Sequence, residues 1–138
     1  MATIINAEGL VLGRMATDTA KRLLKGDEVI IINAGQAVIS GAKRTILDEE
    51  TAKRDRGSNI RQGPFYRRVS RDYVKRTIRG MLPKTARGRE ALARLKVYSG
   101  QPQGMEANTE LAGARVEKLP YPKFLTIDQI TKSMGGRQ

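Results

Sequence analysis

The chain has 138 residues, with 26 Lys and Arg against 14 Asp and Glu, and it contains no Cys, no His and no Trp. This length predicts one domain spanning residues 1–138, and the missing Cys and His exclude a disulfide scaffold, thiolate or imidazole metal sites and a catalytic thiol. A formal net charge of +12 favours a polyanionic partner, while the absence of a long apolar run predicts a cytoplasmic protein with no membrane span.

The N-terminal residues are predicted to form a β-strand, a helix and a second strand. Residues Thr3–Asn6 are predicted to form the first strand, and residues 10–25 carry apolar side chains at helical spacing. Gly26 suits the left-handed conformation just beyond a helix end. The run at residues 28–32, which has four consecutive β-branched residues after Glu28, is typical of a strand covered on both faces, so this region predicts a βαβ unit of a parallel sheet.

The next segments are less regular. Residues 37–40 form a strand-like run that either continues the preceding strand through a kink or pairs elsewhere, because the intervening residues are too few for a parallel crossover. Residues 41–55 are weakly helical. Residues 57–69 combine Gly, Pro, two aromatics and three Arg without a period, which predicts a loop. Like-charge repulsion predicts that this loop is mobile in the free protein.

Residues 70–82 have the clearest amphipathic pattern in the chain. On a helical wheel the basic residues from Arg68 to Arg79 occupy one side, while Tyr73, Val74, Thr77, Ile78 and Met81 occupy the other. Ser70 is a candidate N-cap, and Leu82 before Pro83 is a natural stop.

The remaining elements are shorter. A second basic helix is predicted over residues 85–95, with Ala91, Leu92 and Leu95 facing inward, and a strand over residues 96–98. Residues 101–122 are loop-like, and residues 124–126 are a terminal strand. Thr126 and Gln129 have capping-box spacing, which predicts a short last helix ending at Gly135.

Two glycine patterns resemble nucleotide-binding loops only superficially. The pair Gly9 and Gly13 precedes a helix but lacks the dinucleotide-binding spacing. The spacing from Gly35 to Gly41 is one residue too long for a P-loop, and Ala42 stands where its Lys belongs. Both patterns favour turns at helix starts. No catalytic constellation is present, so we expect neither an enzyme nor a cofactor or small-molecule substrate.

The net charge is concentrated in residues 53–96. These 44 residues contain 15 Lys and Arg against three acids, whereas the rest of the chain contains 11 residues of each sign. Solvated surfaces ordinarily mix both signs, so this block indicates a phosphate-binding surface rather than charge for solubility. Arg outnumbers Lys in the block by eleven to four, which suits RNA because guanidinium groups bind phosphate and stack on bases.

The basic residues of this block, with the aromatic residues among them, are candidate RNA ligands. Phe65 and Tyr66 either stack on bases or pack onto their own domain. Lys43 and Arg44 are available to a backbone phosphate at a helix start. No RRM-type or KH-type motif is present, so we expect recognition of shape and backbone. The predicted RNA-binding residues are Lys43, Arg44, Arg61, Phe65, Tyr66, Arg67, Arg68, Arg71, Lys75, Arg76, Arg79, Lys84, Arg87 and Arg89.

Several segments resemble one protein family. The run Val-Lys-Arg-Thr-Ile-Arg-Gly-Met-Leu-Pro at residues 74–83, followed by Arg-Gly-Arg-Glu-Ala-Leu at 87–92, is similar to the signature of large-subunit ribosomal protein L-thirteen. Residues 9–16 and 37–41 also match, and the archaeal type fits best. Many relatives have His after the Leu-Pro pair, where this chain has Lys84, which retains a cation.

The resemblance implies a fold, a function and partners. The expected fold is a single three-layer α/β/α domain with a mainly parallel, roughly four-stranded sheet. The expected function is binding of large-subunit ribosomal RNA beside neighbouring ribosomal proteins, with a role in subunit assembly and no catalysis.

Two alternatives remain open from the residues. A free RNA-binding regulator would bind one messenger hairpin tightly and accumulate away from ribosomes. A nucleotide-using enzyme would exploit the turns at Gly9 or Gly41 and would require measurable affinity for a nucleotide.

Overall fold

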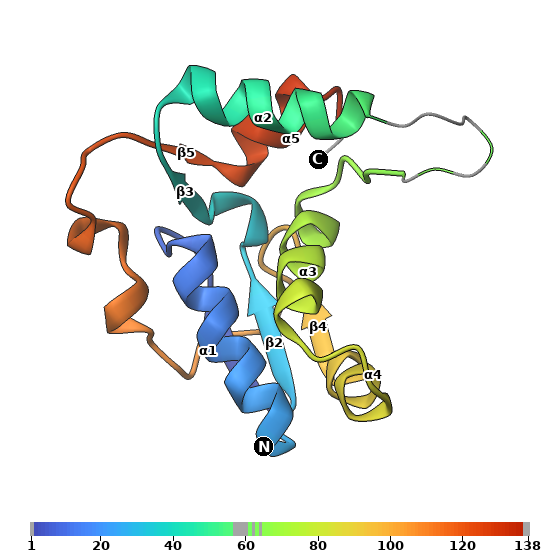
Figure 1. Cartoon of the computed structure of the whole chain (residues 1–138). Coiled ribbons are helices and arrows are strands. Elements are labelled where there is room, and N and C mark those ends of the chain that lie inside the picture. Colours follow the sequence, from blue (N-terminus) through green and yellow to red (C-terminus); the bar gives the residue numbers. More distant parts are fainter. Residues whose placement is uncertain (1, 57–60, 62, 64, 137–138) are drawn as a thin grey trace.

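A parallel three-stranded sheet forms the centre of the molecule in the computed structural model, which describes residues 2–56, 61, 63 and 65–136 (Figure 1). The strands β1 (Thr3–Asn6), β2 (Val29–Ile32) and β4 (Leu95–Val97) lie in the order β1-β2-β4. Ile5 of β1 is in register with Ile31, which is in turn in register with Val97. The predicted βαβ unit and its parallel strand pair are therefore confirmed.

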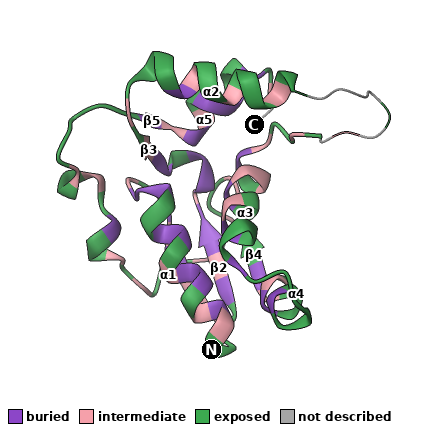
Figure 2. Ribbon diagram, viewed as in Figure 1, coloured by how far each residue is buried: buried purple, intermediate pink, exposed green. Residues whose placement is uncertain are grey.

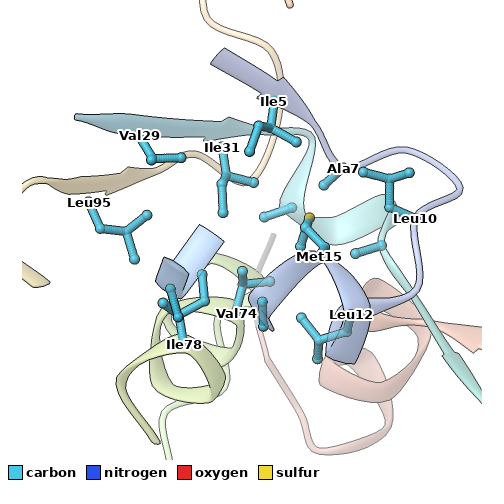
Figure 3. Close-up of a cluster of buried hydrophobic side chains, with 14 of the residues drawn as sticks. Ile5, Ala7, Leu10, Leu12, Met15, Val29, Ile31, Val74, Ile78 and Leu95 are labelled. Carbon is cyan, nitrogen blue, oxygen red and sulfur yellow. The ribbon is translucent and has the colours of Figure 1, made fainter. Parts of the chain in front are cut away.

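Three helices pack close to this sheet: α1 (Leu12–Lys25), α3 (Ser70–Met81) and α4 (Ala86–Ala93). Strand residues Ile5, Val29 and Ile31 point toward Met15 of α1 and Val74 of α3, as Figure 3 shows. The apolar residues of α1 are buried because they recur at helical spacing and therefore share one face. The buried residues of α1 are Leu12, Met15, Ala16, Thr19, Ala20 and Leu23.

A second, smaller unit of structure lies beyond the carboxyl ends of the parallel strands (Figure 1). The strands β3 (Val38–Ser40) and β5 (Phe124–Thr126) pair antiparallel, and the helices α2 (Lys43–Asp55) and α5 (Ile127–Ser133) pack beside them. Residues 37–40 are therefore a strand of a separate ribbon rather than a continuation of β2. Two buried side chains, Ile46 of α2 and Ile130 of α5, belong to the apolar cluster of this unit.

The long connection after β4 runs back along the N-terminal part of the chain. Thr109 forms an isolated parallel bridge with Ile5, and Arg115 forms an antiparallel bridge with Leu10. The short 3-10 turns Ala112–Ala114 and Val116–Lys118 lie in this connection, and a third, Ala34–Gln36, joins β2 to β3. These contacts hold the predicted loop against β1 and the start of α1.

Several details differ from the expectations. The single α/β domain with a mainly parallel sheet is as expected, but the expected four strands become three parallel strands and a separate antiparallel pair. Ser70 does not cap α3, because its hydroxyl donates to Asp128 of α5 instead. The helix predicted over residues 85–95 ends at Ala93, and Leu95 begins β4.

Other expectations meet mixed outcomes. Met81 lies on the predicted apolar side of α3 but is exposed, because it is in the last turn of the helix. The capping box of Thr126 is confirmed. The mobility expected of the loop at residues 57–69 stays a prediction, and residues 57–60, 62 and 64 of this loop lie outside the described residues.

Burial follows the layers of the molecule. Figure 2 shows β2 as largely buried, while the outward faces of α2 and α3 are exposed. None of the helices in the described ranges is long and apolar enough to cross a membrane. The exposed faces of α2 and α3 carry the charges considered next.

Candidate nucleic-acid interface

A wide groove runs between α2, α3 and α4 and has a volume of about 1100 Å³. We call it the basic groove, because seven cationic side chains and two acidic ones line it. Its lining residues are Glu50, Lys53, Arg56, Phe65, Tyr66, Arg67, Asp72, Tyr73, Lys75, Arg76, Thr77, Arg79, Gly80, Arg89, Leu92 and Met134.

The amphipathic pattern of α3 positions the cations of one wall. Val74 and Ile78 are fully buried against the sheet, which fixes the rotation of the helix about its axis. The helix therefore holds Lys75, Arg76 and Arg79 on the solvent side, where all three are exposed. Burial of the apolar face thus aims the basic face into the groove.

Glu50 ties α2 to α3 at the base of the groove. Its side chain is only 12% exposed and accepts a hydrogen bond from Lys53 Nζ at 3.0 Å. The Tyr73 hydroxyl of α3 also donates to Glu50. Burial of the phenol, followed by the charge and hydrogen bond of Glu50, raises the pKa of Tyr73 well above its ordinary value. The two partners satisfy the carboxylate and fix the spacing between the helices.

Tyr66 is held by a cation–π contact with the neighbouring helix. The Arg76 guanidinium lies over its ring, 3.7 Å from the centroid. Tyr66 therefore packs onto its own domain, one of the two outcomes left open for the aromatic pair. Phe65 is 71% exposed, so its ring is available at the rim of the groove.

Asp72 forms ion pairs with two arginines near the start of α3. Its carboxylate lies 3.5 Å from Arg67 Nη1 and 3.8 Å from Arg71 Nε. Because these pairs are long and the arginines are largely exposed, they contribute little to stability. The guanidinium groups keep most of their hydrogen-bonding capacity for a ligand.

The structure brings about half of the predicted RNA-binding residues into the basic groove. The predicted residues that line it are Phe65, Tyr66, Arg67, Lys75, Arg76, Arg79 and Arg89. Five others are exposed outside the lining, namely Arg61, Arg68, Arg71, Lys84 and Arg87. Arg87 also donates to the Leu24 carbonyl of α1 at 3.1 Å, which gives this side chain a structural contact.

Lys43 and Arg44 do not join the other candidates. They lie at the first turn of α2, whereas the groove is lined by the last turns of the same helix. Ten helical residues separate Lys43 from Lys53, which corresponds to about 15 Å. These two cations therefore belong to a different part of the surface.

Two groove cations, Lys53 and Arg56, are absent from the predicted set. Both fall within the basic block of residues 53–96. The charge count therefore included them, although neither was predicted individually as an RNA-binding residue. Glu50 was missed as well, because its burial depends on contact with α3. Among the residues that the structure describes, no group of three Asp and Glu side chains is placed to hold a metal ion.

Comparison with known proteins gives consistent results over nearly the whole chain. A family model described as "Ribosomal protein L13" matches residues 1–104. The chain is 46% identical over 140 residues to "Large ribosomal subunit protein uL13" of Methanosarcina barkeri, covering 98% of this chain and 99% of that protein. Proteins with the same name from Methanococcoides burtonii and Methanocaldococcus jannaschii are 43% and 40% identical, each again covering 98% of this chain and 99% and 98% of their own lengths.

Proposed function

The chain belongs to the ribosomal protein L13 family, and we propose that it is a structural component of the large ribosomal subunit that binds large-subunit ribosomal RNA through the basic groove. The family consists of ribosomal structural proteins and not of enzymes. The single observation that carries the RNA-binding part is the convergence of seven cations from α2, α3, α4 and the 65–67 segment on one groove.

The proposed mechanism is electrostatic. RNA phosphates entering the groove replace their condensed counterions with Lys and Arg side chains, and release of those ions drives binding. Burial of Val74 and Ile78 on α3, together with Ile46 on α2, holds the cations in place before RNA arrives, which lowers the entropic cost of binding. The exposed ring of Phe65 adds a surface on which an unpaired base stacks.

The remaining parts of the proposal concern context. We expect the chain to fold as one domain of 138 residues, to lie against neighbouring large-subunit proteins and to support subunit assembly. We also expect it to reside in the cytoplasm as part of the ribosome. The half-exposed sheet residues Ile4 and Ile30, which face away from Ile5 and Ile31, are available to such neighbours.

The proposal is tested by the salt dependence of binding. Full-length protein is titrated with large-subunit RNA over a series of KCl concentrations. Contact with about eight phosphates predicts a log–log slope of about −6 to −7. Neutralising two groove cations, Lys75→Gln with Arg79→Gln, is expected to weaken binding and to reduce the steepness of the slope by about 1.4 to 1.8.

The matched control neutralises two exposed lysines of α1, Lys21→Gln with Lys25→Gln, which makes the same change in net charge outside the groove. We expect the control slope to equal that of the unmodified chain. A slope near −1, or equal losses in the two double variants, would contradict the proposed groove.

Sedimentation separates the ribosomal role from that of a free regulator. Stable migration of the chain with large subunits through a high-salt wash supports the proposal. A chain that remains mostly in the unbound fractions and binds one messenger hairpin tightly contradicts it.

A further inference from the structure

A second cationic surface with exposed aromatic rings lies at the opposite end of α2 from the basic groove. Strand β5 pairs Phe124 with Ser40 of β3, and the Gly41 amide donates to the Lys123 carbonyl at 2.9 Å. These contacts place residues 121–124 beside the turn that leads into α2 (Figure 1). We call the resulting set Lys43, Arg44, Tyr121, Lys123 and Phe124 the ribbon surface.

The two aromatic rings of this surface are exposed. Tyr121 is 74% exposed and Phe124 is 45% exposed, although aromatic side chains usually bury most of their area. Pro120 and Pro122 flank Tyr121, and each fixes its own φ angle and supplies no amide donor. The restricted backbone around Tyr121 reduces the backbone entropy that this segment loses when a ligand binds.

The charges around these rings have one sign. Lys43, Arg44 and Lys123 are exposed, and the sequence has no acidic residue within 40–47 or 118–127. The nearest described ion pair joins Arg44 to Asp48 at 3.8 Å. Because the Arg44 side chain is 95% exposed and that of Asp48 is 73% exposed, this pair is weak and leaves the guanidinium available.

We propose that the ribbon surface is a second RNA-binding site that takes unpaired nucleotides by stacking bases on Tyr121 and Phe124 while Lys43, Arg44 and Lys123 neutralise the adjacent phosphates. Paired bases are already stacked inside a duplex, so exposed rings select single-stranded segments. Every base has a π face, and the site therefore tolerates different sequences.

The ribbon surface is independent of the basic groove. Lys43 and Lys53 lie about 15 Å apart along α2, so one folded RNA can reach both sites with different segments. Residues 121–124 also lie outside residues 1–104, which the family model matches. The inference depends on the proposed function only for the identity of the RNA.

The test uses the full chain and a fluorescently labelled single-stranded RNA of about twelve nucleotides, a length that one small stacking site accommodates. The variant Tyr121→Leu with Phe124→Leu keeps apolar side chains but removes both rings. We expect a five-fold to more than a hundred-fold loss of affinity with an unchanged salt slope, because stacking involves no counterions. Urea unfolding verifies that the variant is folded.

The matched control is Tyr121→Phe, which keeps the ring and loses only the hydroxyl, and it is expected to bind like the unmodified chain. Incorporating 5-iodouridine into the RNA is expected to give photo-crosslinks to Tyr121 or Phe124. Equal affinity of the double Leu variant and the unmodified chain, or an equal loss in Tyr121→Phe, overturns the proposal.

Two further outcomes separate this site from the groove and from a protein partner. If the ribbon variant loses affinity and the Lys75→Gln, Arg79→Gln variant does not, the ribbon proposal stands and the groove fails. If the double Leu variant keeps its affinity for RNA but no longer sediments with large subunits, the surface docks a protein and the RNA proposal is overturned.

Discussion

At the level of single residues, the burial and hydrogen-bond partners of Glu50 explain why an acidic side chain is tolerated in the basic groove. Its carboxylate is mostly buried and accepts hydrogen bonds from Lys53 and Tyr73. An unpaired buried carboxylate would destabilise the fold by several kcal/mol, so these partners are required. Glu50 therefore holds α2 against α3 and does not repel RNA as an exposed acid would.

The contact between Tyr73 and Glu50 makes a prediction about pH. Tyr73→Phe is expected to destabilise the chain by about 1 to 3 kcal/mol at about pH 8, because it removes a hydrogen bond to a charged group. The raised pKa means that the folded chain keeps the phenol proton after the unfolded chain has lost it. Native stability from this group is therefore complete below about pH 10 and falls as the pH rises further.

Urea unfolding of the unmodified chain and the variant at about pH 8 and about pH 11 tests this. The difference in the free energy of unfolding should shrink at the higher pH. Tyr98→Phe, which removes a hydroxyl outside the groove lining, is the control. A difference that grows above about pH 10 would show that the sign of the shift is wrong.

At the scale of elements, the turn between α3 and α4 depends on a small residue. Gly88 of α4 lies so close to Pro83 that a Cβ atom at residue 88 would overlap the Pro83 carbonyl oxygen. This close approach lets α4 fold back directly after Pro83 and places Arg89 at the groove. Gly80 of α3, in contrast, has open space where a Cβ atom would lie.

The two glycines form a matched pair of substitutions. Gly88→Ala is expected to destabilise the chain by about 1 to 3 kcal/mol, because backbone must move to remove the overlap. Gly80→Ala is expected to stabilise it by about 0.5 to 1 kcal/mol, because Ala has the higher helix propensity. Midpoints of urea unfolding measure both effects, and equal midpoints would contradict this account of the turn.

At the scale of the whole molecule, the two apolar clusters are connected. The larger one lies between the parallel sheet and its helices, and the smaller one lies between the antiparallel strands β3 and β5 and the helices α2 and α5. Ile39 and Tyr73 pack against both. Ser70 adds a polar link, because its hydroxyl joins α3 to Asp128 of α5.

Because of this sharing, we expect the chain to unfold as one cooperative unit. Helix content from far-UV circular dichroism and tyrosine fluorescence are expected to give coincident urea transitions. The four tyrosines report on the fold without interference, since the chain has no Trp. Two separated transitions would show that the unit formed by β3, β5, α2 and α5 is a separate domain.

The local elements and the sign of the charged surface follow from the sequence alone. The periods of α1 and α3, the β-branched run of β2 and the segregation of charge into residues 53–96 are properties of neighbouring residues, and each was predicted. Burial of one face fixes such a helix regardless of its partner, so these predictions need no knowledge of distant contacts.

Which of these residues lie together depends on contacts between elements that are distant in the sequence. Pairing of β3 with β5 joins segments more than eighty residues apart and creates the ribbon surface from Lys43, Arg44 and residues 121–124. The basic groove likewise depends on α2 lying against α3, which brings Lys53 and Arg56 beside Arg76 and Arg79 and separates Lys43 from them. Such contacts arise from packing between elements that are distant in the sequence, so the spacing of residues along the chain does not predict them.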